Sequence, residues 1–261
     1  MRKVTIIAEV GSNWLGKIQI GKRLIKECKD RGADCVKFQV WKAKELYNDS
    51  HPYWKQINES ELTFSKASEL KSYADRIGIE WFASVFYPDG VAWLESLGVK
   101  MFKISNRRSP RDVEVMKRIA ETGLPQICSI SSLEDAHNCI EILGNPPFEM
   151  LKLLYCVPEY PCPDERVNLS EIDNLRKELR YEIGFSDHTL GITASIAAAA
   201  VGAAVIEKHV MLKKNTVSAD ACCSITVDEL EQLVMHVRRI ENMRYLRDDK
   251  REKGSPESSG T

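Results

Sequence analysis

Two histidines near the C-terminal end of the chain follow apolar, strand-like segments and are candidates for one metal site. His188 lies in the segment 184–189, which reads GFSDHT, and His209 ends the segment 205–209, which reads VIEKH. About twenty residues with a helix-like pattern separate the two histidines. If the segments are neighbouring parallel strands, both imidazoles point into one pocket, where they suit Mn, Mg with water, Fe or Zn. For either histidine alone, a buried side chain with two hydrogen bonds is the simpler interpretation. Together they favour a metal-dependent enzyme.

Two lysines lie inside otherwise apolar segments. Lys37 is in 35–40 (CVKFQV) and Lys103 in 101–105 (MFKIS). A buried ammonium without a partner is costly, so each lysine must reach a carboxylate or an anionic ligand. Glu9 and Glu207 are candidate partners, and Glu9 could equally contact a substrate. An anion-binding role is favoured for the lysines. A Schiff base, as in aldolases, stays open as an alternative.

These side chains need a scaffold, and the chain alternates between strand-like and helix-like segments from end to end. The predicted strands are short and apolar on both faces, as in a parallel sheet covered on both sides. They are Val4–Gly11, Cys35–Val40, Ile79–Phe86, Met101–Ser105, Pro125–Ser131, Met150–Val157, Tyr181–His188 and Val205–Leu212. An amphipathic segment follows each, the last being Val227–Leu246. Eight such pairs in about 250 residues predict an α/β fold, the (β/α)8 TIM barrel.

A barrel of this kind carries its chemistry where the strands end at their C-terminal side. The polar residues expected there are Glu9, Lys37, Gln39, Ser84, Lys103, Arg107, Arg108, Ser129, Tyr160, Ser186, His188, Glu207 and His209, with Asp220 in the loop after the last strand. This set suits a phosphorylated or carboxylated substrate with a polyol or sugar partner. The other histidines, His51, His137 and His236, are interpreted as structural or exposed, whereas Tyr53 and Trp54 could cover the pocket.

Composition limits the remaining classes of function. A net charge of -1 gives no electrostatic reason to expect nucleic acid or an anionic membrane as a partner. No apolar run reaches ~18 residues, and the N-terminus lacks the apolar core of a signal peptide. The eight cysteines lack CxxC spacing and are expected to be free thiols. We therefore expect a cytoplasmic protein with a barrel over residues 1–247. Residues 248–261 are predicted to be a disordered tail or the start of a linker.

Six segments resemble the sialic acid synthase (N-acetylneuraminate synthase) family. They are 8–13 (AEVGSN), 32–39 (GADCVKFQ), 102–104 (FKI), 159–161 (EYP), 184–191 (GFSDHTLG) and 206–209 (IEKH). The resemblance runs from about Val4 to Leu246. It implies condensation of phosphoenolpyruvate with N-acetylmannosamine or a related amino sugar, with release of phosphate. By resemblance, His188 and His209 hold Mn or Mg; Lys37, Lys103, Ser129 and Ser186 hold phosphoenolpyruvate; and Glu9, Gln39, Tyr160 and Asp220 contact the sugar.

The chain departs from this family in two respects. Residues 105–108 read Ser-Asn-Arg-Arg where the family has Gly/Ala-Ser-Gly-Glu, so a catalytic carboxylate and a phosphate-binding serine are replaced. We expect Arg107 or Arg108 to take over phosphate binding, because guanidinium groups bind phosphate in a bidentate manner. The antifreeze-like domain, which the family carries after the barrel and inserts into the partner of a homodimer, is absent from the sequence. A homodimer is nevertheless expected.

Two alternatives to a phosphoenolpyruvate-dependent synthase remain open. The replaced carboxylate and the missing second domain would suit a barrel that has lost turnover and binds a sugar or a partner protein. The buried lysines would suit a Schiff-base aldolase.

Overall fold

Eight parallel strands close into a barrel in the computed structural model, which describes residues 3–252, with side chains in the last helix described up to residue 243. Each strand pairs with the next, and the first pairs with the eighth to complete the ring. The strands are β1 (Thr5–Glu9), β2 (Cys35–Val40), β3 (Glu80–Val85), β4 (Phe102–Ile104), β5 (Gln126–Ile130), β6 (Leu151–Cys156), β7 (Glu182–Asp187) and β8 (Val205–Met211). The predicted (β/α)8 barrel is therefore confirmed.

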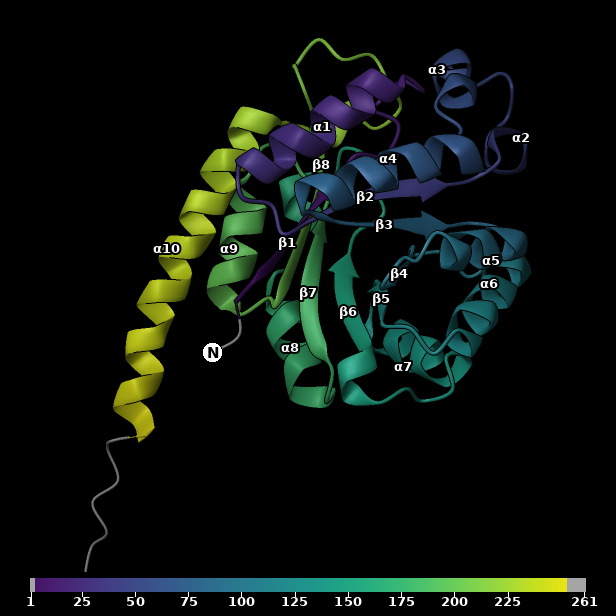
Figure 1. Cartoon of the computed structure of the whole chain (residues 1–261). Helices are drawn as coiled ribbons and strands as arrows, with labels where there is room; N and C mark the ends of the chain where they lie inside the picture. The colour runs from purple at the N-terminus through teal and green to yellow at the C-terminus, as the bar shows by residue number, and fades with distance from the viewer. Residues whose placement is uncertain (1–2, 253–261) are drawn as a thin grey trace, which may run out of the picture.

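Helices surround the strands, and α10 packs beside α9 on one side of the molecule (Figure 1). The long helices are α1 (Ile18–Asp30), α4 (Phe64–Ile77), α5 (Pro88–Ser96), α6 (Pro110–Glu121), α7 (Leu133–Ile142), α8 (Ser170–Glu178), α9 (Thr193–Val201) and α10 (Val227–Glu252). Their starts follow local chemistry: the Ser132 hydroxyl accepts from the Asp135 N–H at the start of α7. No helix within the described residues is long and apolar enough to cross a membrane.

Four smaller features were not predicted. The segment between β2 and α4 contains two short helices, α2 (Ala43–Leu46) and α3 (Trp54–Glu59), and a two-residue strand β9 (Ile225–Thr226) pairs with the end of β8. Helix α10 continues to Glu252, so residues 248–252 of the segment predicted as a tail are helical. The rest of that segment, 253–261, lies outside the described residues.

The strand period of two builds the interior of the barrel in layers. Six apolar side chains pack together within it: Ile7, Cys35, Phe82, Ile127, Leu154 and Val205. Two residues further along the same strands stand Glu9, Lys37, Ser84, Ser129, Cys156 and Glu207. Because alternate residues face the same side of a strand, an apolar layer is followed by a polar one towards the C-terminal ends. Gly184 leaves room for this packing, since a Cβ there would lie 2.5 Å from Leu154 Cδ2.

Candidate active site

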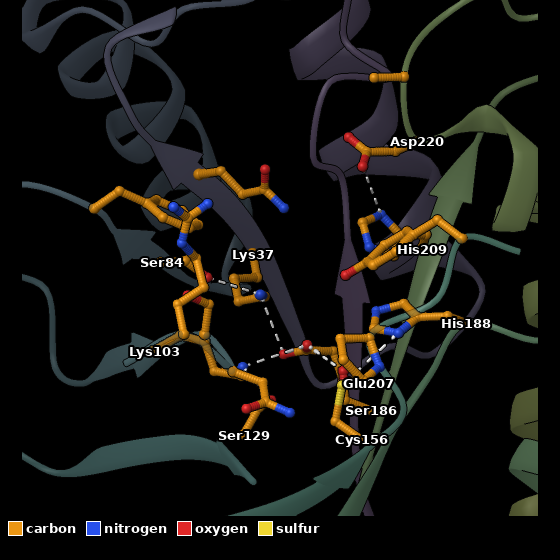
Figure 2. Close-up of a pocket in the computed structure, with 18 of the residues that line it drawn as sticks. Lys37, Ser84, Lys103, Ser129, Cys156, Ser186, His188, Glu207, His209 and Asp220 are labelled. Carbon is orange, nitrogen blue, oxygen red and sulfur yellow. Dashed lines mark hydrogen bonds and ion pairs between the residues drawn. The ribbon is translucent and has the colours of Figure 1, made fainter. Parts of the chain in front are cut away.

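A cavity of about 580 Å³ opens above the polar layer, at the C-terminal ends of the strands. Two lysines and the hydroxyls of Ser84 and Ser129 lie on one side of it, and the two histidines and Asp220 lie on the other, with the Glu207 carboxylate reaching towards the lysines (Figure 2). The predicted site residues that line the cavity are Lys37, Gln39, Ser84, Lys103, Arg107, Ser129, Tyr160, Ser186, His188, Glu207, His209 and Asp220. Sequence reasoning therefore located the cavity from strand ends alone.

Two lysines and two glutamates form a buried cluster at the floor of this cavity. Lys37 Nζ lies 3.0 Å from Glu9 Oε2 and 3.3 Å from Glu207 Oε2, and Lys103 Nζ lies 3.7 Å from Glu207 Oε1. Each lysine also donates to a serine: Lys37 to Ser84 Oγ at 2.9 Å and Lys103 to Ser129 Oγ at 2.7 Å. The two ammonium groups are thus fixed side by side, with hydroxyls beside them.

Charge pairing decides the protonation of the cluster. Burial alone would raise the pKa of Glu207, but Lys103, Lys37 and the Ser186 hydroxyl outweigh it and lower the pKa to about 2. Burial lowers the pKa of Lys37, yet Glu207 and Glu9 more than offset this and raise it. For Lys103 burial prevails over Glu207, and the pKa is lowered. Glu207 is therefore a fixed anion between two cations.

Glu9 belongs to this cluster rather than to the cavity surface. It is fully buried and does not line the cavity. Its Oε1 accepts a hydrogen bond from Gln39 Nε2 at 2.6 Å, and its pKa is raised by burial, which Lys37 offsets in part. The sequence left open whether Glu9 pairs with a lysine or contacts the substrate. In the structure Glu9 pairs with Lys37 and accepts a hydrogen bond from Gln39, and Gln39 lines the cavity.

His188 has a defined tautomer. Its Nδ1 lies 3.0 Å from the carbonyl oxygen of Val157, which can only accept, so Nδ1 carries the proton and Nε2 keeps its lone pair. Burial, followed by the neighbouring His209, lowers the pKa of His188 to about 4, so the ring is neutral near pH 7. Tyr160 packs on it with ring centroids 4.0 Å apart. A neutral imidazole held through its second nitrogen is the usual form of a histidine that binds metal.

His209 lies beside His188, with ring centroids 5.6 Å apart. That separation is compatible with one ion bound about 2.1 Å from a nitrogen of each ring. Its Nδ1 is buried, has no hydrogen-bond partner and lies 4.0 Å from Asp220 Oδ1. Among the side chains that the structure describes, up to residue 243, no group of three or more from histidine, cysteine, aspartate and glutamate could hold a metal. The two imidazoles therefore fit an ion only as a partial ligand set, completed by water or substrate oxygens.

Asp220 is positioned by the start of the chain. Its Oδ2 accepts from the N–H of Ser12 at 2.6 Å and from the Ser12 hydroxyl. Gly11 adopts a φ of +50°, and a Cβ on it would lie 2.5 Å from Asp220 Oδ2. A side chain at position 11 would therefore displace the carboxylate, which explains the glycine in the segment after β1.

The two consecutive arginines behave differently. Arg107 lines the cavity, and its Nε lies 3.7 Å from Asp112, a carboxylate already bound to Ser109. Arg108 does not line the cavity. Its guanidinium bonds to Asp135 Oδ1 at 2.9 Å, and to the carbonyl oxygens of Ser105 and Ser129 at 2.9 Å and 2.7 Å. Of the two arginines predicted to bind phosphate, Arg107 is therefore the remaining candidate. The hydrogen bonds of Arg108 connect the loop after β4 to the end of β5 and the start of α7.

A second buried ion pair lies behind the histidines. Asp187 and Lys208 are register partners on β7 and β8, and both are almost wholly buried. Lys208 Nζ lies 3.2 Å from Asp187 Oδ2 and donates to the carbonyl of Thr189 at 2.6 Å, while Asp187 Oδ1 accepts from the N–H of Thr189. Each of these two residues immediately precedes a histidine. The pair ties the two strand ends together just where the imidazoles project.

Sequence reasoning missed part of the cavity wall. His51, interpreted as structural or exposed, lines the cavity, and so do Tyr47, Tyr53 and Cys222. Tyr53 was expected as a cover, whereas Trp54 packs in the small apolar cluster beneath. The sequence signal that could have identified these residues is the length of the connection after β2. It has 23 residues before α4 begins, far more than an ordinary βα loop needs.

Comparisons with known proteins find relatives that match most of this chain. The sequence model of the NeuB family matches residues 24–247. An uncharacterized protein of Methanocaldococcus jannaschii is 36% identical over 91% of this chain and 71% of its own length. An N,N'-diacetyllegionaminic acid synthase of Campylobacter jejuni is 33% identical over 92% of this chain and 77% of its own. An N-acetylneuraminic acid synthetase from Leptospira borgpetersenii superimposes with a TM-score of 0.85 at 27% identity, covering 100% of this chain and 88% of that one.

Proposed function

The chain belongs to the NeuB family, and from this premise we propose that it condenses phosphoenolpyruvate with an N-acetylated amino sugar to give a nine-carbon sialic-acid-type sugar. The observation that carries the proposal is one cavity with two chemically distinct sides. Paired ammonium groups with hydroxyls face the imidazoles of His188 and His209 across it. The names of the similar synthases give the class of product, and the family resemblance implies phosphoenolpyruvate and an amino sugar as substrates.

The floor of the cavity suits phosphoenolpyruvate. Lys103 and Ser129 present a cation and a hydroxyl, and Ser186, which donates to Glu207 Oε1 at 2.9 Å, lies beside them. The substrate is a trianion, yet Lys37 and Lys103 are already balanced by carboxylates. Arg107 supplies a cavity-facing cation whose neighbouring carboxylate, Asp112 at 3.7 Å, is already bound to Ser109, and we assign Arg107 to the phosphate group.

The reaction conserves atoms without a further reagent. The methylene carbon of phosphoenolpyruvate bonds to the aldehyde carbon of the open-chain sugar. Water adds to the cationic carbon that results, the bond from this carbon to the bridging oxygen breaks, and phosphate leaves behind a keto group. The two protons of the water end on the former aldehyde oxygen and on phosphate. Fixed cations near the departing phosphate stabilise charge as it moves.

The other side of the cavity suits the sugar. His188 and His209 would hold a divalent ion, Mn or Mg, which when bound polarises the aldehyde oxygen. Gln39, Asp220 and Tyr160 also line the cavity and offer an amide, a carboxylate and a ring to hydroxyl and acyl groups. Glu9 acts through Gln39, since it fixes the orientation of that amide.

The test is phosphate release from phosphoenolpyruvate with Mn²⁺ and a panel of N-acetylated hexosamines, with His209→Ala alongside. We expect release that depends on one sugar and is lost in the variant. Arg107→Ala should raise KM for phosphoenolpyruvate by about 10- to 100-fold, the loss of one charge-assisted hydrogen bond. Silence across the panel, with the fold intact, would refute the proposed activity and favour a barrel that only binds a sugar or partner. Light scattering would check the expected homodimer.

A Schiff-base aldolase is a second candidate because burial lowers the pKa of Lys103, which favours a free amine. Borohydride reduction in the presence of a keto acid separates the two functions. The proposed synthase forms no imine, so covalent trapping on Lys103, detected by mass change and absent in Lys103→Met, would favour the aldolase.

A further inference from the structure

The outer part of the cavity is built by the long segment between β2 and α4. This segment, residues 41–63, folds onto the barrel through the buried side chains of Trp41, Ala43 and Ile57, which pack with Phe86 from the loop after β3. A hydrogen bond within the segment fixes its own conformation, since Glu61 accepts from the N–H of Ala43 at 2.8 Å. It is therefore a fixed wall of the cavity.

Three aromatic rings of this segment face the cavity in sequence. The Tyr47 and His51 ring centroids are 5.5 Å apart, and those of His51 and Tyr53 are 6.0 Å apart. Burial raises the pKa of Tyr47 to about 12, with Asp220 adding to the effect and Arg107 opposing it. Tyr47 thus lies within electrostatic reach of both Asp220 and Arg107, between the loops that follow β8 and β4. The rings and Asp220 together bound the mouth of the cavity.

The mouth offers no cation that a second anionic group could use. Of the side chains described along this cavity, those with a full positive charge are Lys37, Lys103 and Arg107. The lysines lie at the floor and are paired with Glu9 and Glu207. His51 Nδ1 is engaged within the segment, where it accepts the N–H of Tyr53 at 3.1 Å.

From this distribution of charge we infer that the acceptor sugar is uncharged, and that a hexosamine carrying its own phosphate is rejected. The inference rests on the proposed function. A phosphate on the far end of the sugar would lose its hydration against aromatic rings and beside the Asp220 carboxylate, with Arg107 already used by phosphoenolpyruvate. Buried anions without a partner are strongly disfavoured. Aromatic rings instead suit the apolar faces and acyl groups of a neutral amino sugar.

The test compares N-acetylmannosamine with its 6-phosphate, as competing acceptors in phosphate release and as ligands in calorimetry with phosphoenolpyruvate present. We expect the neutral sugar to be favoured at least about 10-fold in kcat/KM and in affinity. Tyr53→Arg, which places a cation in the mouth, should shift the ratio towards the 6-phosphate by about 10-fold or more. Phe64→Arg is the matched control, since Phe64 is exposed on α4 and outside the cavity, and it should leave the ratio unchanged.

The outcomes separate this inference from the proposed function. Equal or better use of the 6-phosphate by the unaltered chain would overturn the inference while leaving the synthase standing. If neither sugar supports phosphate release, the proposed activity fails. Calorimetry then still tests whether the cavity prefers the neutral sugar over its 6-phosphate. Tighter binding of the 6-phosphate, or binding of neither sugar, would overturn the inference as well. A shift of equal size in Tyr53→Arg and Phe64→Arg would show that net charge, and not the cavity mouth, sets the preference.

Discussion

Replacing Glu207 by glutamine tests the charge cluster at the floor of the cavity. The substitution preserves shape but removes the one carboxylate that both lysines share, 3.3 Å from Lys37 Nζ and 3.7 Å from Lys103 Nζ. Lys37 keeps Glu9, whereas Lys103 loses the only carboxylate within 4 Å among the described residues. An unpaired buried cation is the main cost of breaking such a pair.

The magnitude follows from the pKa of Glu207, which falls from 4.5 to about 2 on folding and corresponds to about 3 kcal/mol of stability. Because the folded pKa is the lower one, this stabilisation is complete above pH 4.5 and disappears as the pH falls towards 2. We therefore expect Glu207→Gln to lower the free energy of unfolding by about 3 kcal/mol at pH 7. Near pH 3 the difference between the two proteins should be roughly half as large.

The assay is urea unfolding of both proteins between pH 7 and pH 3, with a chelator present so that bound metal does not contribute. Glu159→Gln is the control, since Glu159 pairs with Arg166 at the exposed rim and should cost no more than about 0.5 kcal/mol. A loss in Glu207→Gln that is below 1 kcal/mol at pH 7, or that stays constant down to pH 3, would refute the assignment of Glu207 as an anion stabilised by the two lysines.

Three other substitutions probe how the site is held. Lys208→Met should lower the free energy of unfolding by about 3–5 kcal/mol, because it leaves Asp187 buried without its cation, and adding Asp187→Asn should restore part of that stability. If the ion pair also positions the histidines, the double variant should still bind Mn²⁺ more weakly in calorimetry. An unaltered Mn²⁺ affinity would assign the pair a purely structural role. Arg108→Ala should lower stability by about 2–4 kcal/mol in thermal unfolding, because Asp135 and two carbonyls lose their donor; an unaltered transition would contradict the bracing role. Gly11→Ala should weaken sugar binding without affecting phosphoenolpyruvate affinity in calorimetry, since its Cβ would push on Asp220; equal losses for both ligands would count against this.

The strand ends were predictable because their pattern is local. Alternation within each short strand, such as Val205 and Glu207 on one face, is read from adjacent residues and decides which side chains enter the barrel. His188 and His209 were placed on neighbouring strands because each follows an apolar, strand-like segment, and the structure brings their ring centroids to 5.6 Å. The polar layer and the two imidazoles could therefore be predicted from sequence.

The direction of individual side chains could not be predicted in this way, because it depends on partners far along the chain. Arg108 turns from the cavity to Asp135, 27 residues later, and Asp220 is oriented by Ser12, 208 residues earlier. Nothing near Arg107 and Arg108 in the sequence distinguishes the two guanidinium groups.

The sequence by itself thus determined the barrel, the layer at which its polar residues stand and the two histidines at the cavity. The tertiary structure alone decided that Glu9 supports Gln39 from behind, that Arg107 and not Arg108 faces the cavity, and that Tyr47 and His51 line it beside Tyr53. The physical reason is range: periodicity is set by neighbouring residues, whereas the orientation of a polar side chain is set by the charge or hydrogen-bond partner that folding brings to it.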